Sequence, residues 1–246
     1  MDMLGHRLRE FYFDDKVLFP RQVLLQPNQQ VHGVWRREVE YRHANGHRVW
    51  VRENIRPLSE SEQLLIVGED ITETKLLSEK LEYQARYDLL TGTYNRNHFE
   101  LELKTALCEV DSHRRVHAML YLDLDQLKVL NDTVGHDAGD AAIQFCASML
   151  EGVLPYNSIL ARMGGDEFAV LLPGICAKEA MTIAERVRNA VSGSERISQD
   201  SMIEVPVNIS MGVAQMASNA SFEDLLRAAD AALYRAKDAG RNAVST

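Results

Sequence analysis

The chain has 246 residues, 46% of them hydrophobic, and a formal net charge of −9 at pH 7. Its length suits one large domain or two modest ones, and its composition is that of an ordinary globular protein. The acidic balance argues against non-specific nucleic-acid binding, and no apolar run in this chain approaches membrane-spanning length. We therefore expect a cytoplasmic location. A single nucleotide ligand is compatible with this charge, because it needs only a metal ion and a few well-placed cations.

The N-terminal part is predicted to form an antiparallel meander. Hydrophobicity alternates over residues 35–43 and 47–58, on either side of the turn-forming pair Asn45-Gly46, and residues 64–68 give a third strand. Asp70 or Thr72 then caps a following helix. The three strands and the exit Asp70-Ile71-Thr72 resemble the C-terminal half of a PAS sensor domain. Because about 70 residues are too few for that fold, the resemblance implies an incomplete PAS-like segment over residues 1–70.

Residues 71–86 are predicted to form a signalling linker helix. The segment is polar, and Ile71, Leu77 and Leu81 lie along a possible apolar seam. Two turns of seam suggest a short parallel coiled coil between subunits, while a plain monomeric linker helix fits the pattern nearly as well.

The remaining residues, 87–246, alternate between helical and strand patterns. We expect helices over 99–110, 138–150, 178–191 and 222–237, and strands over 118–124, 158–163, 168–172 and 205–214. After the opening helix, this order is β-α-β-β-α-β with a closing helix. It predicts an α/β (α+β) domain of the ferredoxin-like, split βαβ type.

Two groups of carboxylates fall where this fold brings strand ends together. The apolar strand 118–122 runs into Asp123-Leu124-Asp125, and the turn pair Gly164-Gly165 is followed by Asp166 and Glu167, which leave the turn on opposite sides. Such an oxygen-only cluster suits a hard cation such as Mg²⁺. Asp125 has the weakest case, since a solvated acid at the strand end explains it equally well.

The run Gly164-Gly165-Asp166-Glu167-Phe168 spells the signature of the GGDEF family, the diguanylate cyclases. The chain resembles this family over about residues 84 to 246, including the opening segment 88–96, in which Thr93 and Tyr94 replace the usual Leu and Pro. The resemblance implies a nucleotidyltransferase that condenses two GTP into cyclic di-GMP and two pyrophosphates, controlled by the N-terminal sensor. It also implies a homodimer, because each subunit binds one GTP. The alternative is a non-catalytic regulatory module that binds GTP or cyclic di-GMP.

The resemblance also assigns metal and catalytic roles. Asp123 and Asp166 are expected to bind Mg²⁺, with Mn²⁺ as an alternative, assisted by the carbonyl oxygen of Leu124. Glu167 is expected to share a second metal or to assist proton removal. Arg162, just before the hairpin turn, is a candidate for stabilising developing negative charge.

Further residues are expected to bind the substrate. By resemblance, Asn131 and Asp140 recognise guanine, Lys128 adds a phosphate contact, and Gly165 lets a ligand approach the backbone. Lys237 and Arg241, four residues apart and both placed by the sequence on the last helix, are expected to clamp the β- and γ-phosphates from one side.

Many members of the family carry an inhibitory product site with the pattern Arg-x-x-Asp. The corresponding positions here hold Pro155 and Ser158. Neither residue offers the charge that such a site needs, so we predict weak or absent feedback inhibition through it.

Overall fold

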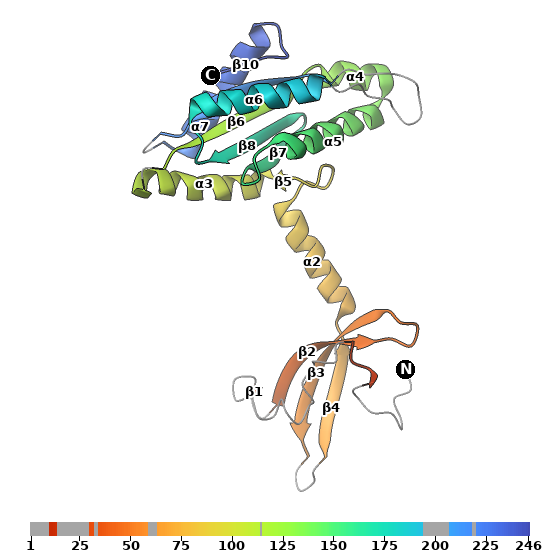
Figure 1. Cartoon of the computed structure of the whole chain (residues 1–246). Coiled ribbons are helices and arrows are strands. Elements are labelled where there is room, and N and C mark those ends of the chain that lie inside the picture. Colours follow the sequence, from red (N-terminus) through yellow and green to blue (C-terminus); the bar gives the residue numbers. More distant parts are fainter. Residues whose placement is uncertain are drawn as a thin grey trace. The chain divides into compact units, whose positions relative to one another are not determined.

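The computed structural model describes residues 10–13, 30–31, 34–58, 63–113, 115–193, 207–217 and 220–246. The chain divides into two compact units, Met1–Glu82 and Tyr83–Thr246. The elements of both units are labelled in Figure 1. No helix among the described residues is both long and apolar enough to cross a membrane.

The N-terminal unit contains an antiparallel four-stranded sheet. Its strands lie in the order β1 (Gln30–Val31), β2 (Val34–Arg42), β3 (Arg48–Pro57) and β4 (Leu64–Asp70). The three predicted strands are confirmed, and β1 adds a short fourth. The sheet buries the carboxylate of Glu53, which accepts hydrogen bonds from the Tyr12 and Tyr41 hydroxyls and from Arg37. A buried charge is tolerated when it is paired in this way.

Helix α2 (Thr72–Arg86) begins at the predicted cap, where Asp70 Oδ1 accepts a hydrogen bond of 2.9 Å from the Thr72 amide. No residue of α2 is buried, and the apolar side chains of Leu77 and Leu81 are 53% and 66% exposed. Ile71, the first residue of the predicted seam, precedes the helix and is buried at 3% exposure, so it is not part of an uncovered seam. The two exposed leucines that remain agree with either predicted form of this helix.

The C-terminal unit is a six-stranded sheet with helices on both faces, in the strand order β10-β9-β6-β8-β7-β5. The fold prediction is confirmed. The elements, in chain order, are β5 (Tyr94–Asn95), α3 (Arg96–His113), β6 (His117–Leu124), α4 (Leu127–Val134), α5 (His136–Val153), β7 (Ile159–Gly164), β8 (Glu167–Pro173), α6 (Ala177–Ser192), β9 (Ile209–Gln215), α7 (Phe222–Asp238) and β10 (Val244–Ser245).

The structure adds elements that the sequence patterns did not predict. Helix α4 occupies a stretch for which the sequence patterns predicted no element, and β5 and β10 extend the two edges of the sheet. The predicted strand 205–214 begins later, at Ile209, and its positions 205 and 206 lie outside the described residues.

Strand β6 is buried along its whole length and separates two hydrophobic layers. Leu120, Leu122 and Leu124 pack with residues of α5 and α6, while Met119 and Tyr121 pack with residues of α3 and α7. Figure 1 shows these helices on either side of the sheet. Because alternate side chains of a strand face opposite sides, the central strand holds both layers and fixes the place where its carboxyl end meets β8.

Candidate active site

The predicted carboxylates converge where β6 ends and β8 begins. Asp123 lies opposite Glu167 in the antiparallel register of the two strands, and the Leu124 amide donates a hydrogen bond of 3.1 Å to the Asp166 carbonyl. Residues directly opposite one another in such a pair lie on the same face of the sheet. The hairpin turn is therefore held against the end of β6 by backbone contacts.

The electrostatics of Asp123 are those of a cation site. Burial, helped by the nearby carboxylates of Asp166 and Glu167 and opposed by Lys237, raises the pKa of its carboxyl to about 6. Lys237 Nζ lies 2.8 Å from Asp123 Oδ1. An ammonium group thus neutralises a cluster of acids that repel one another, and a divalent cation suits the same oxygen donors. Among the described residues, no group of three or more His, Cys, Asp or Glu side chains is arranged to hold a metal ion. The Mg²⁺ ligands Asp123, Asp166 and the Leu124 carbonyl therefore stay a prediction, which the buried, acid-flanked carboxyl of Asp123 favours.

The arrangement of the two phosphate-clamp candidates differs from the prediction. Lys237 lies in the last turn of α7, but α7 ends at Asp238, so Arg241 is not on the helix. Gly240, Arg241 and Asn242 all have positive φ, and such a left-handed run ends the helix and turns the chain toward β10. The expectation that helical spacing places both cations on one side is therefore wrong. Lys237 meets Asp123 instead, and Arg241 lines a pocket of about 480 Å³ that α4, residues 207–208 and the end of β6 at Leu124 also line.

Asp125 is not a solvated strand-end acid. Its carboxylate accepts a hydrogen bond of 2.8 Å from the Ser210 hydroxyl and one of 2.9 Å from the Asn242 amide. Asp125 therefore fixes the loop that carries Arg241 to the end of β6, which is a structural role next to the site.

Glu167 faces the α3 and α7 side of the sheet, near Tyr121. Burial raises the pKa of the Tyr121 hydroxyl, and a hydrogen bond with the Glu167 carboxylate raises it further. The hydroxyl consequently stays protonated and donates to Glu167. This contact orients the second acid of the signature, as residues behind an active site commonly do.

Asn131 and Gly139 are in close contact across the junction of α4 and α5. Asn131, expected in a turn, lies in α4, because the left-handed Gln126 (φ 60°) starts a helix directly after the strand. A Cβ atom at Gly139 would lie 1.9 Å from Asn131 Oδ1, which is buried and has no hydrogen-bond partner among the described residues. A buried carbonyl oxygen without a partner is costly and points to a missing donor.

The other guanine-contact candidate and the remaining phosphate candidate are both exposed. Asp140 lies on α5 one residue after Gly139, and Lys128 lies in the first turn of α4. Asn131 and Asp140 thus lie on two adjacent helices. The unpaired side-chain oxygen of Asn131 points toward Gly139 of the second helix.

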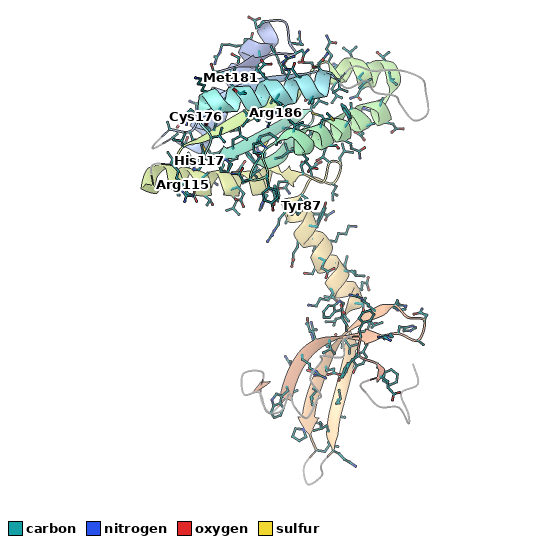
Figure 2. All side chains as sticks on the ribbon, viewed as in Figure 1. Tyr87, Arg115, His117, Cys176, Met181 and Arg186 are labelled. Atoms are coloured by element: carbon teal, nitrogen blue, oxygen red, sulfur yellow. The ribbon has the colours of Figure 1, made fainter. Side chains whose placement is uncertain are left out.

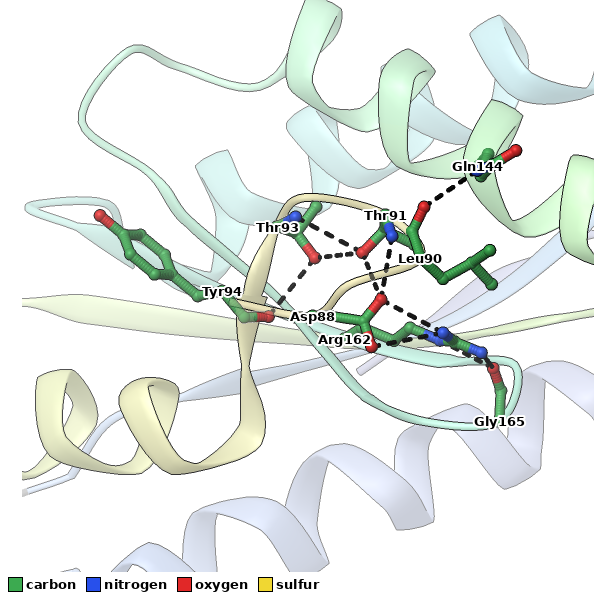
Figure 3. A network of polar contacts seen from close by, with 8 residues as sticks. All are labelled: Asp88, Leu90, Thr91, Thr93, Tyr94, Gln144, Arg162 and Gly165. Carbon is green, nitrogen blue, oxygen red and sulfur yellow. Dashed lines mark hydrogen bonds and ion pairs between the residues drawn. The ribbon is translucent and has the colours of Figure 1, made fainter. Parts of the chain in front are cut away.

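Arg162 makes contacts that the sequence did not predict (Figure 3). Its Nη1 atom lies 3.2 Å from Asp88 Oδ1, and its Nε and Nη2 atoms donate to the Gly165 carbonyl at 3.0 and 2.7 Å. Asp88 also accepts from the amide and hydroxyl of Thr91. Burial alone would raise the pKa of Asp88, but the hydrogen bonds from Thr91 and the charge of Arg162 hold it below its ordinary value.

This network connects the opening segment to the signature turn. Thr93, which replaces the usual Leu, is buried and its hydroxyl lies 2.9 Å from that of Thr91, so the substitution is accommodated by a polar contact. An Asp three residues before a Thr is typical of a turn capped by its own side chain. The sequence therefore contains a signal for the contact between Asp88 and Thr91, but none for the contact between Asp88 and Arg162.

Comparison with known proteins agrees with this fold and site. Residues 85–243 match the family described as "Diguanylate cyclase, GGDEF domain". The chain is 38% identical over 174 residues to the probable diguanylate cyclase DgcC of Escherichia coli, covering 70% of this chain and 46% of DgcC. It is 35% identical over 182 residues to the cyclic di-GMP phosphodiesterase PdeB of Shewanella oneidensis, covering 73% of this chain and 20% of PdeB. It thus spans less than half the length of these relatives.

Among solved structures, the coiled coil and GGDEF domain of DgcB from Caulobacter crescentus, in complex with c-di-GMP, matches with a TM-score of 0.66 and 33% identity. The match covers 70% of this chain and 93% of that one. The C-terminal unit thus has the fold of a GGDEF domain. The chain belongs to the GGDEF diguanylate cyclase family.

Proposed function

We propose that residues 87–246 form an active diguanylate cyclase, which condenses two GTP molecules into cyclic di-GMP and two pyrophosphates. The observation that carries this proposal is the convergence of Asp123, Asp166 and Glu167 with Lys237 at one edge of the sheet. The signature acids and their cation lie together on a domain of the matching family, which favours phosphoryl chemistry over a purely structural role.

In this proposal Asp123, Asp166 and the Leu124 carbonyl hold Mg²⁺ or Mn²⁺. When bound, the metal neutralises charge at the α-phosphate and lowers the pKa of the attacking 3′-hydroxyl. With a cation bound at Asp123, the ammonium group of Lys237 would be available to bind the triphosphate. Glu167, oriented by Tyr121, either shares a second metal or accepts the proton of the nucleophile.

The substrate is held by residues on the neighbouring elements. The side-chain amide of Asn131, held against Gly139 by its buried oxygen, donates a hydrogen bond to N3 or O6 of guanine. The Asp140 carboxylate accepts from the base edge, and Lys128 and Arg241 bind phosphate oxygens. Gly165, at φ 54°, keeps the turn free of a side chain so that phosphate can approach the backbone.

Each subunit supplies one GTP, so the reaction requires two domains face to face, and we propose a homodimer formed through α2. The N-terminal unit is proposed to be a PAS-like sensor that controls this encounter, in the cytoplasm. The uncovered side chains of Leu77 and Leu81 support the dimer.

The test is incubation of the chain with GTP and MgCl₂ over a range of protein concentrations, with separation of nucleotides by chromatography. We expect cyclic di-GMP and pyrophosphate, at a specific rate that rises with protein concentration. If no cyclic dinucleotide forms at any concentration, the domain is the alternative, a non-catalytic GTP- or cyclic di-GMP-binding module. The observation that favours this alternative is the match to part of PdeB, a protein named as a cyclic di-GMP phosphodiesterase and not as a cyclase.

A further inference from the structure

A second pocket lies on the C-terminal unit, among residues that the proposed reaction does not use. Its volume is about 310 Å³. It is lined by segment 87–94, at the start of the domain, and by segment 151–160, between α5 and β7. The lining residues are Tyr87, Gly92, Thr93, Tyr94, Glu151, Leu154, Pro155, Tyr156, Ser158 and Leu160.

The charge around this pocket favours a cation. Among its described lining residues Glu151 is the one formally charged side chain at neutral pH, and no Lys or Arg is present. Glu151 lies in the last turn of α5, which has no basic residue of its own. The carboxyl end of a helix carries a partial negative charge, which adds to that of Glu151. Arg186, labelled in Figure 2, donates to the Val153 carbonyl and satisfies one of the terminal acceptors.

The walls of the pocket are aromatic. Tyr87, labelled in Figure 2, stacks on Tyr94 with ring centroids 5.0 Å apart, which fixes both rings. Tyr156 is fully exposed, so its ring is free to stack on a ligand. Fixed tyrosines, a free ring and the carboxylate of Glu151 together suit a planar cation.

We propose that this pocket binds the guanidinium group of an arginine side chain presented by a protein partner. A guanidinium group has five donors and no acceptor, stacks on aromatic rings and pairs with a carboxylate, so it matches Tyr156 and Glu151 at once. The volume is at the low end of small-molecule sites, which suits a single side chain. Tyrosine and arginine are also the residues that most often dominate protein interfaces. The net charge of −9 favours a basic partner.

The experiment is a titration of the full chain, labelled with ¹⁵N, followed by two-dimensional NMR. The probe is N-acetyl-arginine N-methylamide, and its uncharged isostere N-acetyl-citrulline N-methylamide is the comparison. We expect saturable shifts of the Gly92, Gly152 and Tyr156 amides with the arginine probe, and at least about tenfold weaker binding of the citrulline probe, since a charge-assisted contact is lost. Equal binding of the two probes, or no saturable shift with arginine, overturns the proposal.

Two further measurements test whether the arginine probe binds beside Glu151 and whether the pocket prefers a protein side chain to a free small molecule. Glu151→Gln should weaken binding of the arginine probe about tenfold, whereas Asp137→Asn, at the opposite end of α5, should leave it unchanged. Free L-arginine should bind no more tightly than the blocked probe, because both carry a net charge of +1 and present the same guanidinium group. Tighter binding of free L-arginine would instead indicate a small-molecule site, and insensitivity to Glu151→Gln would place the binding elsewhere. Both results contradict the proposal, and none of these measurements depends on cyclase activity.

Discussion

Arg162 joins Asp88, the second residue after helix α2, to the carbonyl oxygen of Gly165 in the signature turn. The guanidinium is only 14% exposed, and it spans two segments 74 residues apart in the chain. A single side chain thus sets the position of the turn that carries Asp166 relative to the end of the linker helix. Arg162 acts here as a positioning residue, which is compatible with its proposed role near developing negative charge.

We expect Arg162→Lys to lower kcat roughly tenfold or more with little change in KM, because lysine keeps the charge but cannot bridge Asp88 and Gly165 with a planar fork. Asp88→Asn should produce a smaller effect in the same direction. Arg115→Lys, which alters an exposed pair with Glu109, is the matched control and should leave turnover unchanged. Steady-state kinetics with GTP measure the changes in kcat and in KM separately. An unaltered kcat in Arg162→Lys would show that Arg162 does not position the turn.

Asp166→Asn is expected to reduce turnover about a hundredfold or more while leaving the fold intact, because a neutral amide cannot supply the ligand charge that Mg²⁺ needs. The side chain is partly exposed, and the Asp166 contact to Leu124 uses its backbone carbonyl, so the substitution preserves that contact. Circular dichroism and thermal melting check the fold, and cyclic di-GMP formation checks activity. A near-normal rate would show that the metal assignment is wrong.

Gly139→Ala should disturb guanine binding through Asn131. The added Cβ would lie 1.9 Å from Asn131 Oδ1, so the amide must move, at a cost of about 1–3 kcal/mol. We expect KM for GTP to rise about tenfold, with a smaller change in kcat.

Gly152 is the matched control for this prediction. It lies in the same helix α5, and no heavy atom is within 4 Å of a Cβ built there. Gly152→Ala should therefore leave KM unchanged and raise stability by roughly 0.5–1 kcal/mol, the usual gain when glycine is replaced within a helix. If both substitutions change KM equally, the contact between Gly139 and Asn131 does not control base recognition.

How far the sequence predicts this molecule depends on the range of the interactions involved. The strands and most helices follow from local hydrophobic periodicity, and the meeting of Asp123 with Glu167 follows from strand order. Helix α4 was missed although Leu127, Leu130 and Val134 have helical spacing, because eight residues are too short a run for that pattern to be distinguished from a turn.

The errors at the site have a similar cause. The placement of Arg241 on α7 assumed that the helix continues, whereas three successive residues with positive φ end it. The Arg162 contact with Asp88 joins parts of the chain that only the tertiary fold brings together. Local patterns therefore identified which residues matter near the signature, but they did not predict which side chains bond to each other.

Replacing Leu77 and Leu81 with serine should lower activity chiefly at low protein concentration. Both side chains are exposed on α2, and if they form a seam between subunits, their loss makes the encounter of two half-sites limiting. The paired substitution of Glu79 and Glu82 by serine is the control, because it imposes the same loss of helix propensity at other exposed positions of α2. Specific activity against protein concentration is the measurement. If the dependence of specific activity on protein concentration is unchanged, α2 is a plain linker helix and not a coiled coil.

Cyclic di-GMP is expected to inhibit the enzyme weakly or not at all through the position of the Arg-x-x-Asp site. That position holds Pro155 and Ser158, which line the pocket containing Glu151, and no described residue of its lining is a cation. A phosphodiester brought there would meet a carboxylate and find no charged donor. Steady-state turnover of GTP with added cyclic di-GMP, alongside calorimetric titration, tests this expectation. The double variant Pro155→Arg with Ser158→Asp should introduce product binding and serves as the positive control. Tight product binding by the natural chain, with inhibition relieved by substituting Pro155 and Ser158, would contradict the prediction and would also oppose a cation-selective pocket.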